Sequence, residues 1–496
     1  MNIKKITALI CSMALTVTAV TGCVGEKKKS DNSELVKLKM YYPVGGTIDD
    51  FGEIKDLFNE YVKEKINAEV EFETPDVSTY YSNYALKFQA SEPVDIMWLN
   101  GSMLLANIRA KAFRELDELL DEYGAGIKEE VSPVLLDGAK INGKLYSIPV
   151  NKEYAIGYAM YYKKELADKY SLDVAEAKTY EQVGELFETI KKNEPSVTPY
   201  FMPKGGEVPK LEIEGISSTK YENVGGVGYI LYDTEADSFV NLYDTEYYKK
   251  RFDYIRDWYK KGYINNDAAT TTTTVGSAFL AGKAWTTYAS AKPLTENLLS
   301  KDFGAELVRG FQTPITSDFS SATGSMLAIP YTSNNPERAM QLLNLLYTDE
   351  YLINLLVYGI EGKHYIKEEN GKIKLPDGVT DLNLTGYNPG ITWRVGNQKL
   401  NYLYDDEPDN KWELYDGFDA KSVESKITGF AFDNTDVRLE SAAMSSVLEE
   451  YRSLLNTGSV EPEEALAELN KKMKDNGFDK ILAEVEKQYA EWKGRK

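Results

Sequence analysis

The chain is poor in the side chains that most often carry catalysis or hold a metal ion. Its 496 residues include one histidine and two cysteines, Cys11 and Cys23. A Ser-His-Asp enzyme would have to use His364, and no Gly-x-Ser-x-Gly turn accompanies it, so we interpret His364 as structural. So few histidines and cysteines also argue against a zinc site, and we predict that the chain holds no cofactor.

Basic charge and long apolar runs are also scarce. The chain has 57 lysines and arginines against 78 aspartates and glutamates, which gives a net charge of −21. An acidic surface repels nucleic acid and anionic lipid, so nucleic-acid binding is set aside. Beyond the N-terminal segment, no apolar run approaches the roughly 20 residues that a membrane-spanning helix needs. We therefore expect that the chain does not form a channel by itself.

The N-terminus has the layout of a secretory signal. Lys4 and Lys5 precede an apolar run over residues 6–20, and small residues follow. The residues before Cys23 resemble a bacterial lipobox, which implies that residues 1–22 are removed and that Cys23 carries lipid such as palmitate. Two or three acyl chains, at about 0.8 kcal/mol per buried methylene, would hold the protein at the extracytoplasmic face of the cell membrane. The alternative is an ordinary cleaved signal with an incidental cysteine.

Residues 23–34 are polar and have little to bury, so they predict a flexible tether. Because Cys23 would be the one cysteine left after processing, no internal disulfide is expected and the body must depend on its core. Its length suits two or three domains.

Strand and helix patterns alternate through most of the ordered chain. The first of them predict a strand over 36–40, a helix over 51–62, a strand over 69–73, a helix over 81–88 and a strand over 96–99. This order indicates an α/β fold in which helices cover sheets with parallel strands. The last third is mostly helical, with helices expected over 438–455 and 462–492. Capping boxes are expected at Thr47 with Asp50 and at Thr179 with Gln182.

Two acidic patterns leave alternatives open. Asp233, Glu235 and Asp237 alternate as in a calcium loop, but the sixth position of that frame is Ser238 and the twelfth is Asp244. We interpret the segment as a solvated acidic turn, although the pattern does not settle whether calcium binds near Asp233. Paired carboxylates for glycoside cleavage also stay open, because 78 acidic residues offer many pairs.

Aromatic residues are abundant, with 36 tyrosines and 6 tryptophans. Both side chains combine a flat apolar face with a polar group. Sugar rings have apolar C–H faces and a rim of hydroxyls, so this composition favours a saccharide cleft. For any single ring, a place in the core or on the surface is the more ordinary interpretation.

Five short strings resemble those of extracellular solute-binding proteins that serve sugar ABC importers, the family that includes maltodextrin-binding proteins. They are SEPVDIMW at 91–98, NGKLYSIP at 142–149, YYKKEL at 161–166 followed by Thr179-Tyr180, FLAGKA at 279–284 and NPERA at 335–339. Lys163 and Tyr180 depart from the asparagine and tryptophan usual in that family. The resemblance implies a two-lobed, type II periplasmic-binding-protein-like fold with a helical C-terminal extension. By analogy, lobe one is expected over 35–149 plus 289–327, and lobe two over 150–288 plus 328–496.

The resemblance also implies a function and a set of contacts. The chain would capture an oligosaccharide between its lobes, as a monomer with no catalytic residue, and deliver it to an ABC permease. We predict that the substrate-binding side chains come from strand ends, crossings and a later insertion, namely Tyr42, Asn100, Ser102, Tyr154, Trp285 and Tyr288, with Trp393 and Asn397 from the insertion. Trp98, in mid-strand, is expected in the core. The alternatives are a surface-attached carbohydrate-active enzyme, hydrolase or lyase, and a binder of peptides or another solute.

Overall fold

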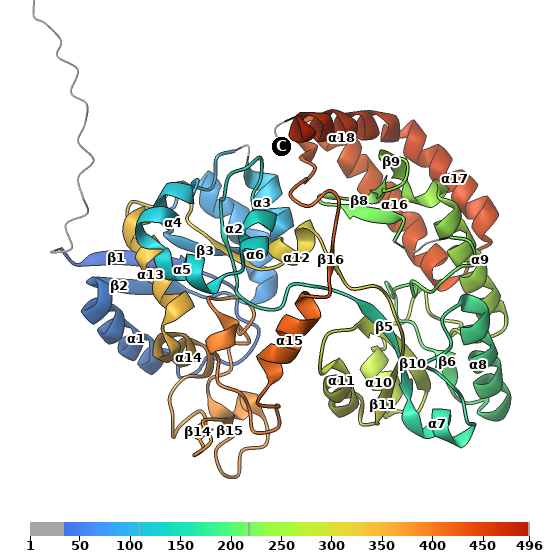
Figure 1. Cartoon of the computed structure of the whole chain (residues 1–496), viewed down its shortest axis with the longest axis horizontal. Helices are drawn as coiled ribbons and strands as arrows, with labels where there is room; N and C mark the ends of the chain where they lie inside the picture. The colour runs from blue at the N-terminus through green and yellow to red at the C-terminus, as the bar shows by residue number, and fades with distance from the viewer. Residues whose placement is uncertain (1–33, 109, 217–218, 495–496) are drawn as a thin grey trace, which may run out of the picture.

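The computed structural model describes residues 34–108, 110–216 and 219–494, and two sheets organise them (Figure 1). The first sheet has the order β2-β1-β3-β13-β4. Its strands are β1 (Val36–Tyr41), β2 (Ala68–Glu73), β3 (Ile96–Leu99), β4 (Ile148–Pro149) and β13 (Met326–Ala328). β1 is parallel to β2 and β3, whereas β13 is antiparallel to β3 and β4. The carboxyl ends of β1 and β3 therefore meet at one edge of the sheet.

Helices cover this first sheet with apolar stripes. They include α1 (Phe51–Ile66), α2 (Val77–Gln89), α3 (Gly101–Ile108), α4 (Asp117–Tyr123), α5 (Ala125–Glu130), α6 (Pro133–Gly138), α13 (Pro336–Thr348) and α14 (Glu350–Tyr358). In α1, Ile54, Phe58 and Val62 recur every four residues and are fully buried, as one helix face against a core requires. Trp98 in β3 is 2% exposed, which confirms the expectation that it belongs to the core.

The capping box predicted at Thr47 and Asp50 does not form. Asp50 stands at the N-cap of α1, but its side chain makes no capping bond. Its carboxylate instead contacts His364 Nε2 at 3.1 Å and Lys363 Nζ at 3.1 Å. These hydrogen bonds lower the pKa of Asp50. His364 Nδ1 accepts from the backbone N–H of Ile360 at 2.8 Å, so the buried imidazole joins two loops, consistent with a structural role.

The second sheet has the order β11-β5-β10-β6. Its strands are β5 (Tyr158–Lys163), β6 (Thr198–Tyr200), β10 (Ala284–Ser290) and β11 (Leu307–Gln312), with α7 (Lys164–Lys169), α8 (Tyr180–Asn193), α9 (Glu246–Lys260), α10 (Val275–Leu280) and α11 (Thr295–Phe303) around it. The capping box of α8 is confirmed, because the Thr179 side chain accepts from the N–H of Gln182 and the Gln182 side chain caps in return. A small antiparallel sheet of β7 (Tyr221–Val224), β8 (Val227–Asp233) and β9 (Ser238–Asn241) adjoins this lobe.

Three C-terminal helices form an outer layer on the second lobe, seen in orange and red in Figure 1. They are α16 (Arg438–Thr457), α17 (Pro462–Asp475) and α18 (Phe478–Lys493). The single helical segment expected over 462–492 is broken at Gly477, whose φ of 97° lies in the left-handed region that favours glycine. Buried residues of all three helices belong to the same core as α8 and α9.

Three segments cross between the lobes. They are residues 150–157, residues 313–325 and residues 420–432, the last two of which pair through β12 (Thr316–Ser317) and β16 (Val423–Glu424). The second crossing also contains the short helix α12 (Phe319–Thr323), and α15 (Lys411–Asp419) precedes the third.

The predicted lobe boundaries differ from this arrangement in two places. Residues 289–312 lie in the second lobe, because β10 continues to Ser290 opposite Tyr158 and β11 pairs with β5. The segment around α13 and α14 lies in the first lobe, because its buried leucines, such as Leu343 and Leu356, join the first core. A helical stripe does not specify which of two cores it covers, so the sequence pattern alone could not assign it.

The predicted signal peptide, the lipid-bearing Cys23 and nearly all of the predicted tether lie outside the described residues. Across residues 34–494, leaving aside the short gaps, no helix is both long and apolar enough to cross a membrane.

Candidate functional site

A cavity of about 430 Å³ opens where the crossings meet the second lobe. Its lining combines crossing residues with residues of β5, β7 and the loops beside them, namely Ile156, Tyr158, Lys210, Tyr221, Glu222, Asn223, Thr313, Asp318, Ser320 and Ser425. A drug-sized ligand site usually measures 300–1,000 Å³, and such sites often lie between domains. The position and size of this cavity mark it as the second-lobe side of an interlobe site.

Two aromatic residues of the second lobe, Tyr158 and Tyr221, line the cavity, and Tyr288 packs against Tyr158. Tyr158 and Tyr288, on neighbouring strands, stack with ring centroids 5.5 Å apart and an interplanar angle of 19°. Lys210 Nζ lies 5.8 Å from the centroid of the Tyr158 ring. Burial raises the pKa of Tyr158, so its hydroxyl stays protonated and can donate a hydrogen bond.

The first lobe contributes a second aromatic surface at the carboxyl end of β3. Trp393 is 40% exposed and Tyr81 is 45% exposed. Both rings pack edge-on against buried Trp98, at 6.2 Å and 6.1 Å between centroids. Asn100 Nδ2 donates to the Tyr81 hydroxyl at 3.3 Å, while Asn100 Oδ1 accepts from the N–H of Met103 and caps α3. Two exposed aromatic faces thus stand beside an amide.

Helix α12 borders both surfaces. A Cβ atom at Gly101 would lie 3.0 Å from the Phe319 ring, and one at Gly225 would lie 2.8 Å from the same ring. Phe319 therefore fills the space between the start of α3 and the β7–β8 turn. A side chain at either glycine would collide with its ring. Since Asp318 and Ser320 line the cavity, α12 connects the first-lobe aromatic surface to the second-lobe cavity.

Three of the predicted binding residues are buried in this conformation and do not face the cavity. Tyr42 is 1% exposed in the first core, Trp285 is fully buried against Tyr162, and Asn397 is fully buried. Asn397 Oδ1 accepts from Asn151 Nδ2 at 2.9 Å, so this amide belongs to a buried network beside the first crossing.

The other predicted residues lie nearer to the site. Trp393, Asn100 and Tyr288 belong to the surfaces described above, and Ser102 is exposed at the start of α3. Tyr154 is partly buried in the first crossing, where its backbone N–H contacts the Asp419 carboxylate at 3.3 Å.

Sequence reasoning missed Tyr81, Tyr158, Lys210 and Asp318. Tyr81 lies on the exposed face of α2, and Tyr158 opens β5 directly after the first crossing. Their position next to a strand end or a crossing was the available signal, but the abundance of tyrosine concealed it. Lys210 and Asp318 stand in loops that no pattern distinguishes.

Charged side chains cluster at the first crossing. Glu153 pairs with Lys292 at 2.5 Å and with Lys152 at 3.8 Å. Burial alone would raise the pKa of Glu153, but the two lysines outweigh it and the pKa is lowered. Burial lowers the pKa of Lys152, and it raises that of Asp419, which accepts from the N–H of Ala155 at 2.9 Å. These contacts fix the crossing to Lys292 of the second lobe and to the end of α15.

The carboxylates of the acidic turn at Asp233 are paired with backbone N–H groups and lysines of the protein. Asp233 Oδ1 accepts from the backbone N–H groups of Glu235 and Ala236, both at 3.0 Å. Lys220 pairs with Glu235 at 3.1 Å, and Lys493 pairs with Asp237 at 2.9 Å. Within the described part of the chain, no three His, Cys, Asp or Glu side chains are grouped to hold a metal ion.

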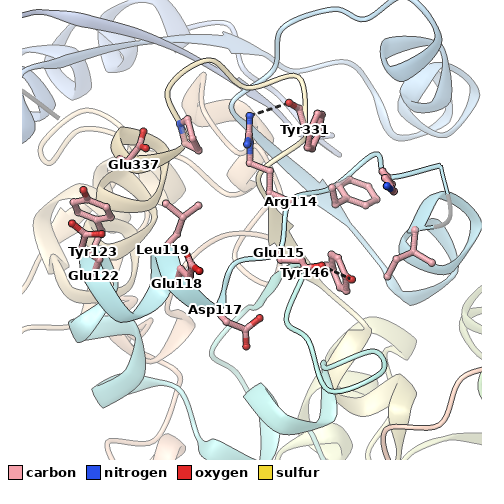
Figure 2. A pocket seen from close by; sticks show the side chains of 14 residues that line it. Arg114, Glu115, Asp117, Glu118, Leu119, Glu122, Tyr123, Tyr146, Tyr331 and Glu337 are labelled. Atoms are coloured by element: carbon pink, nitrogen blue, oxygen red, sulfur yellow. Dashed lines mark hydrogen bonds between the residues drawn. The ribbon is translucent and has the colours of Figure 1, made fainter. Parts of the chain in front are cut away.

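A larger cavity, of about 920 Å³, lies on the first lobe alone (Figure 2). Its labelled residues include Arg114, Glu118, Tyr146 and Tyr331, and Arg114 donates to the Tyr331 carbonyl oxygen at 3.1 Å. Residues of the second sheet are absent from its lining, so this cavity is not formed between the two lobes. Size alone therefore does not identify the functional site.

Comparisons with known proteins agree with this architecture. Residues 56–359 match the family described as bacterial extracellular solute-binding protein, and residues 426–494 match a domain family of unknown function. The chain is 27% identical to a carbohydrate ABC transporter substrate-binding protein of Streptococcus pneumoniae, over 98% of this chain and 97% of the relative.

Solved structures are similar as well. The N-glycan transport solute binding protein NgtS of Streptococcus pneumoniae superposes with a TM-score of 0.79 at 25% identity, covering 92% of this chain and 98% of NgtS. The complex of NgtS with Man5GlcNAc superposes with a TM-score of 0.69 at 26% identity, covering 93% and 99%. Because the family match spans more than half of the sequence, the chain belongs to the bacterial extracellular solute-binding proteins.

Proposed function

We propose that this chain captures an oligosaccharide between its two lobes and presents it, chemically unchanged, to the permease of an ABC importer. The observation that carries the proposal is the pairing of two aromatic surfaces across α12. Trp393 and Tyr81 stand on one lobe, and Tyr158 and Tyr288 stand on the other. Aromatic faces suit the apolar sides of sugar rings, while nearby amide, hydroxyl and ammonium groups suit the hydroxyls.

Relatives support the ligand class. The relative that covers nearly the whole chain is a carbohydrate ABC transporter substrate-binding protein, and NgtS has been solved with Man5GlcNAc and Man1GlcNAc. The chain superposes less well on the Man5GlcNAc complex, at 0.69, than on the NgtS structure that scores 0.79. Hinge motion that closes two lobes around a ligand is usual for this architecture.

The carboxylates of the cavity support binding without catalysis. Glu222 accepts from the Ser425 hydroxyl at 2.7 Å and from the Lys426 N–H at 3.0 Å. Asp318 accepts from the N–H of Ser321 at 3.1 Å and caps α12. Two of the three carboxylates that line the cavity thus have local structural partners, and the third, Glu424, is exposed, whereas a glycosidase needs a free acid together with a free base or nucleophile.

The proposal includes a lipid anchor. Cys23 would attach the monomer to the membrane, and the polar residues up to 34 would let the body reach the permease.

Calorimetric titration of the chain from residue 24 onward tests the function. Man5GlcNAc, other neutral oligosaccharides, acidic oligosaccharides and short peptides are the ligands to compare, followed by product analysis of each bound glycan. We expect saturable binding of one glycan class and recovery of that glycan intact. Cleavage of the glycan would establish the enzyme alternative, and binding of peptides alone would refute a carbohydrate ligand.

A further inference from the structure

Arg394 is a buried cation beside the first-lobe aromatic surface. It follows Trp393 in a loop that packs against the segment after β1, around Gly45, and it is 8% exposed. No Asp or Glu oxygen of the described residues lies within 4.0 Å of its nitrogens. Its Nη1 donates to the carbonyl oxygen of Gly390 at 2.8 Å, whereas its buried Nε has no partner.

Other buried arginines of the chain are better provided with acceptors. Arg251, 4% exposed, donates to a tyrosine hydroxyl and to two carbonyl oxygens. Arg338, 3% exposed, donates to two carbonyl oxygens at the C-terminal end of α1, where the helix dipole attracts a cation. Arg394 has one carbonyl oxygen for five N–H groups.

Aromatic rings surround the guanidinium but do not neutralise it. Its central carbon lies 4.3 Å from the centroid of Trp393 and 5.9 Å from that of Trp98. Such contacts attract a cation but carry no net negative charge. Burial lowers the pKa of Arg394, the direction expected for a cation removed from water without a counter-ion. A buried charge of this kind is costly unless something pairs with it.

We infer that Arg394 anchors a carboxylate of the ligand, so that the captured glycan contains an acidic sugar, a uronic or a sialic acid, next to the ring that stacks on Trp393. The inference rests on the proposed oligosaccharide-binding function. A planar guanidinium binds a carboxylate through two parallel hydrogen bonds and supplies the charge that a neutral sugar does not need. The overall charge of −21 does not oppose this contact strongly, because salt screens exposed charges beyond about 8 Å.

The test compares acidic glycans with their methyl esters, which keep the same rings and lose the charge. Oligogalacturonates and a sialylated N-glycan oligosaccharide supply the two kinds of acid, and their neutral parent glycans complete the set. Affinities are measured by titration calorimetry at 50 mM and 300 mM salt, for the original chain and for Arg394→Met and Arg394→Lys. Arg114→Met is the matched control, because Arg114 also lies over an aromatic ring, 4.9 Å from Tyr331, in the cavity outside the cleft.

We expect at least one acidic glycan to bind about tenfold or more tightly than its ester, as a charged hydrogen bond allows. Arg394→Met should abolish this preference, Arg394→Lys should retain part of it, and Arg114→Met should leave it intact. Equal affinity for every acid and its ester, or preference for neutral glycans, would overturn the inference while leaving the proposed function standing. Binding of no glycan at all would overturn both. Thermal melts of each variant identify any loss of binding that comes from misfolding.

Discussion

Removing the Trp393 indole should weaken glycan binding substantially. The ring is 40% exposed, and the Arg394 guanidinium covers one of its faces at 4.3 Å, so the opposite face is the one open to a sugar. A tryptophan presents about 250 Å² in all, so a stacked sugar would remove about 50 Å² of indole and a similar area of its own from water. At about 25 cal/mol per Å², 100 Å² corresponds to about 2.5 kcal/mol, or about 60-fold in affinity.

The assay is calorimetric titration of Trp393→Ala and Trp393→Phe with the best ligand of the original chain. We expect the alanine variant to lose about 60-fold, within a factor of several, and the phenylalanine variant to lose less than tenfold. Tyr351→Ala is the control, since Tyr351 is 47% exposed on α14 and packs against Tyr61, outside the cleft. An alanine variant that remains folded and binds within twofold of the original would refute Trp393 as a stacking surface.

Three further predictions concern the first crossing and the anchor. Glu153→Gln should lower the melting temperature at pH 7, because it leaves the partly buried Lys292 without its carboxylate. The difference in melting temperature should shrink as the pH falls through the lowered pKa of Glu153, where the original chain also loses that charge. Asn397→Ala should lower the free energy of unfolding in urea by about 1–3 kcal/mol, because Asn151 loses a buried acceptor. The glycan affinity of the folded variant should not change. A large loss of affinity in a variant that is still fully folded would place Asn397 in the site. Cys23→Ser should move the protein from the membrane fraction to the soluble fraction, and unchanged membrane association would contradict the lipid anchor.

The secondary structure could be predicted from the sequence where the apolar residues recur with a clear strand or helix period. The alternation at 36–40 and the helical spacing of Ile54 and Phe58 correspond to β1 and α1. The box at Thr179 formed, whereas the one at Thr47 and Asp50 did not, because His364 and Lys363, distant in sequence, bind the Asp50 carboxylate. A capping motif is local, but its side chain responds to whatever the tertiary fold brings near it.

The site was less predictable, because whether a residue in a strand faces the core or the cleft depends on strand register. Trp285 and Tyr288 are three positions apart on β10, and both pack against the same core. Trp285 enters the core against Phe187, while Tyr288 stacks on Tyr158 beside the cavity. Both were chosen from residue type and approximate position. Without the pairing of β10 with β5, nothing in the sequence shows that Tyr288, and not Trp285, reaches Tyr158.

The tyrosine content illustrates the same limit. Most of the rings singled out by composition stabilise the cores, as Tyr162, Tyr180 and Tyr347 do by being fully buried. The binding hypothesis depends instead on the few rings left partly exposed at the carboxyl ends of strands and at the crossings. Those rings are costly to leave in water, and Arg394 is costly to bury without a counter-ion. Trp393 and Arg394 lie at the same edge of the first lobe. A glycan that stacks on Trp393 and pairs with Arg394 would therefore remove both unfavourable free-energy contributions.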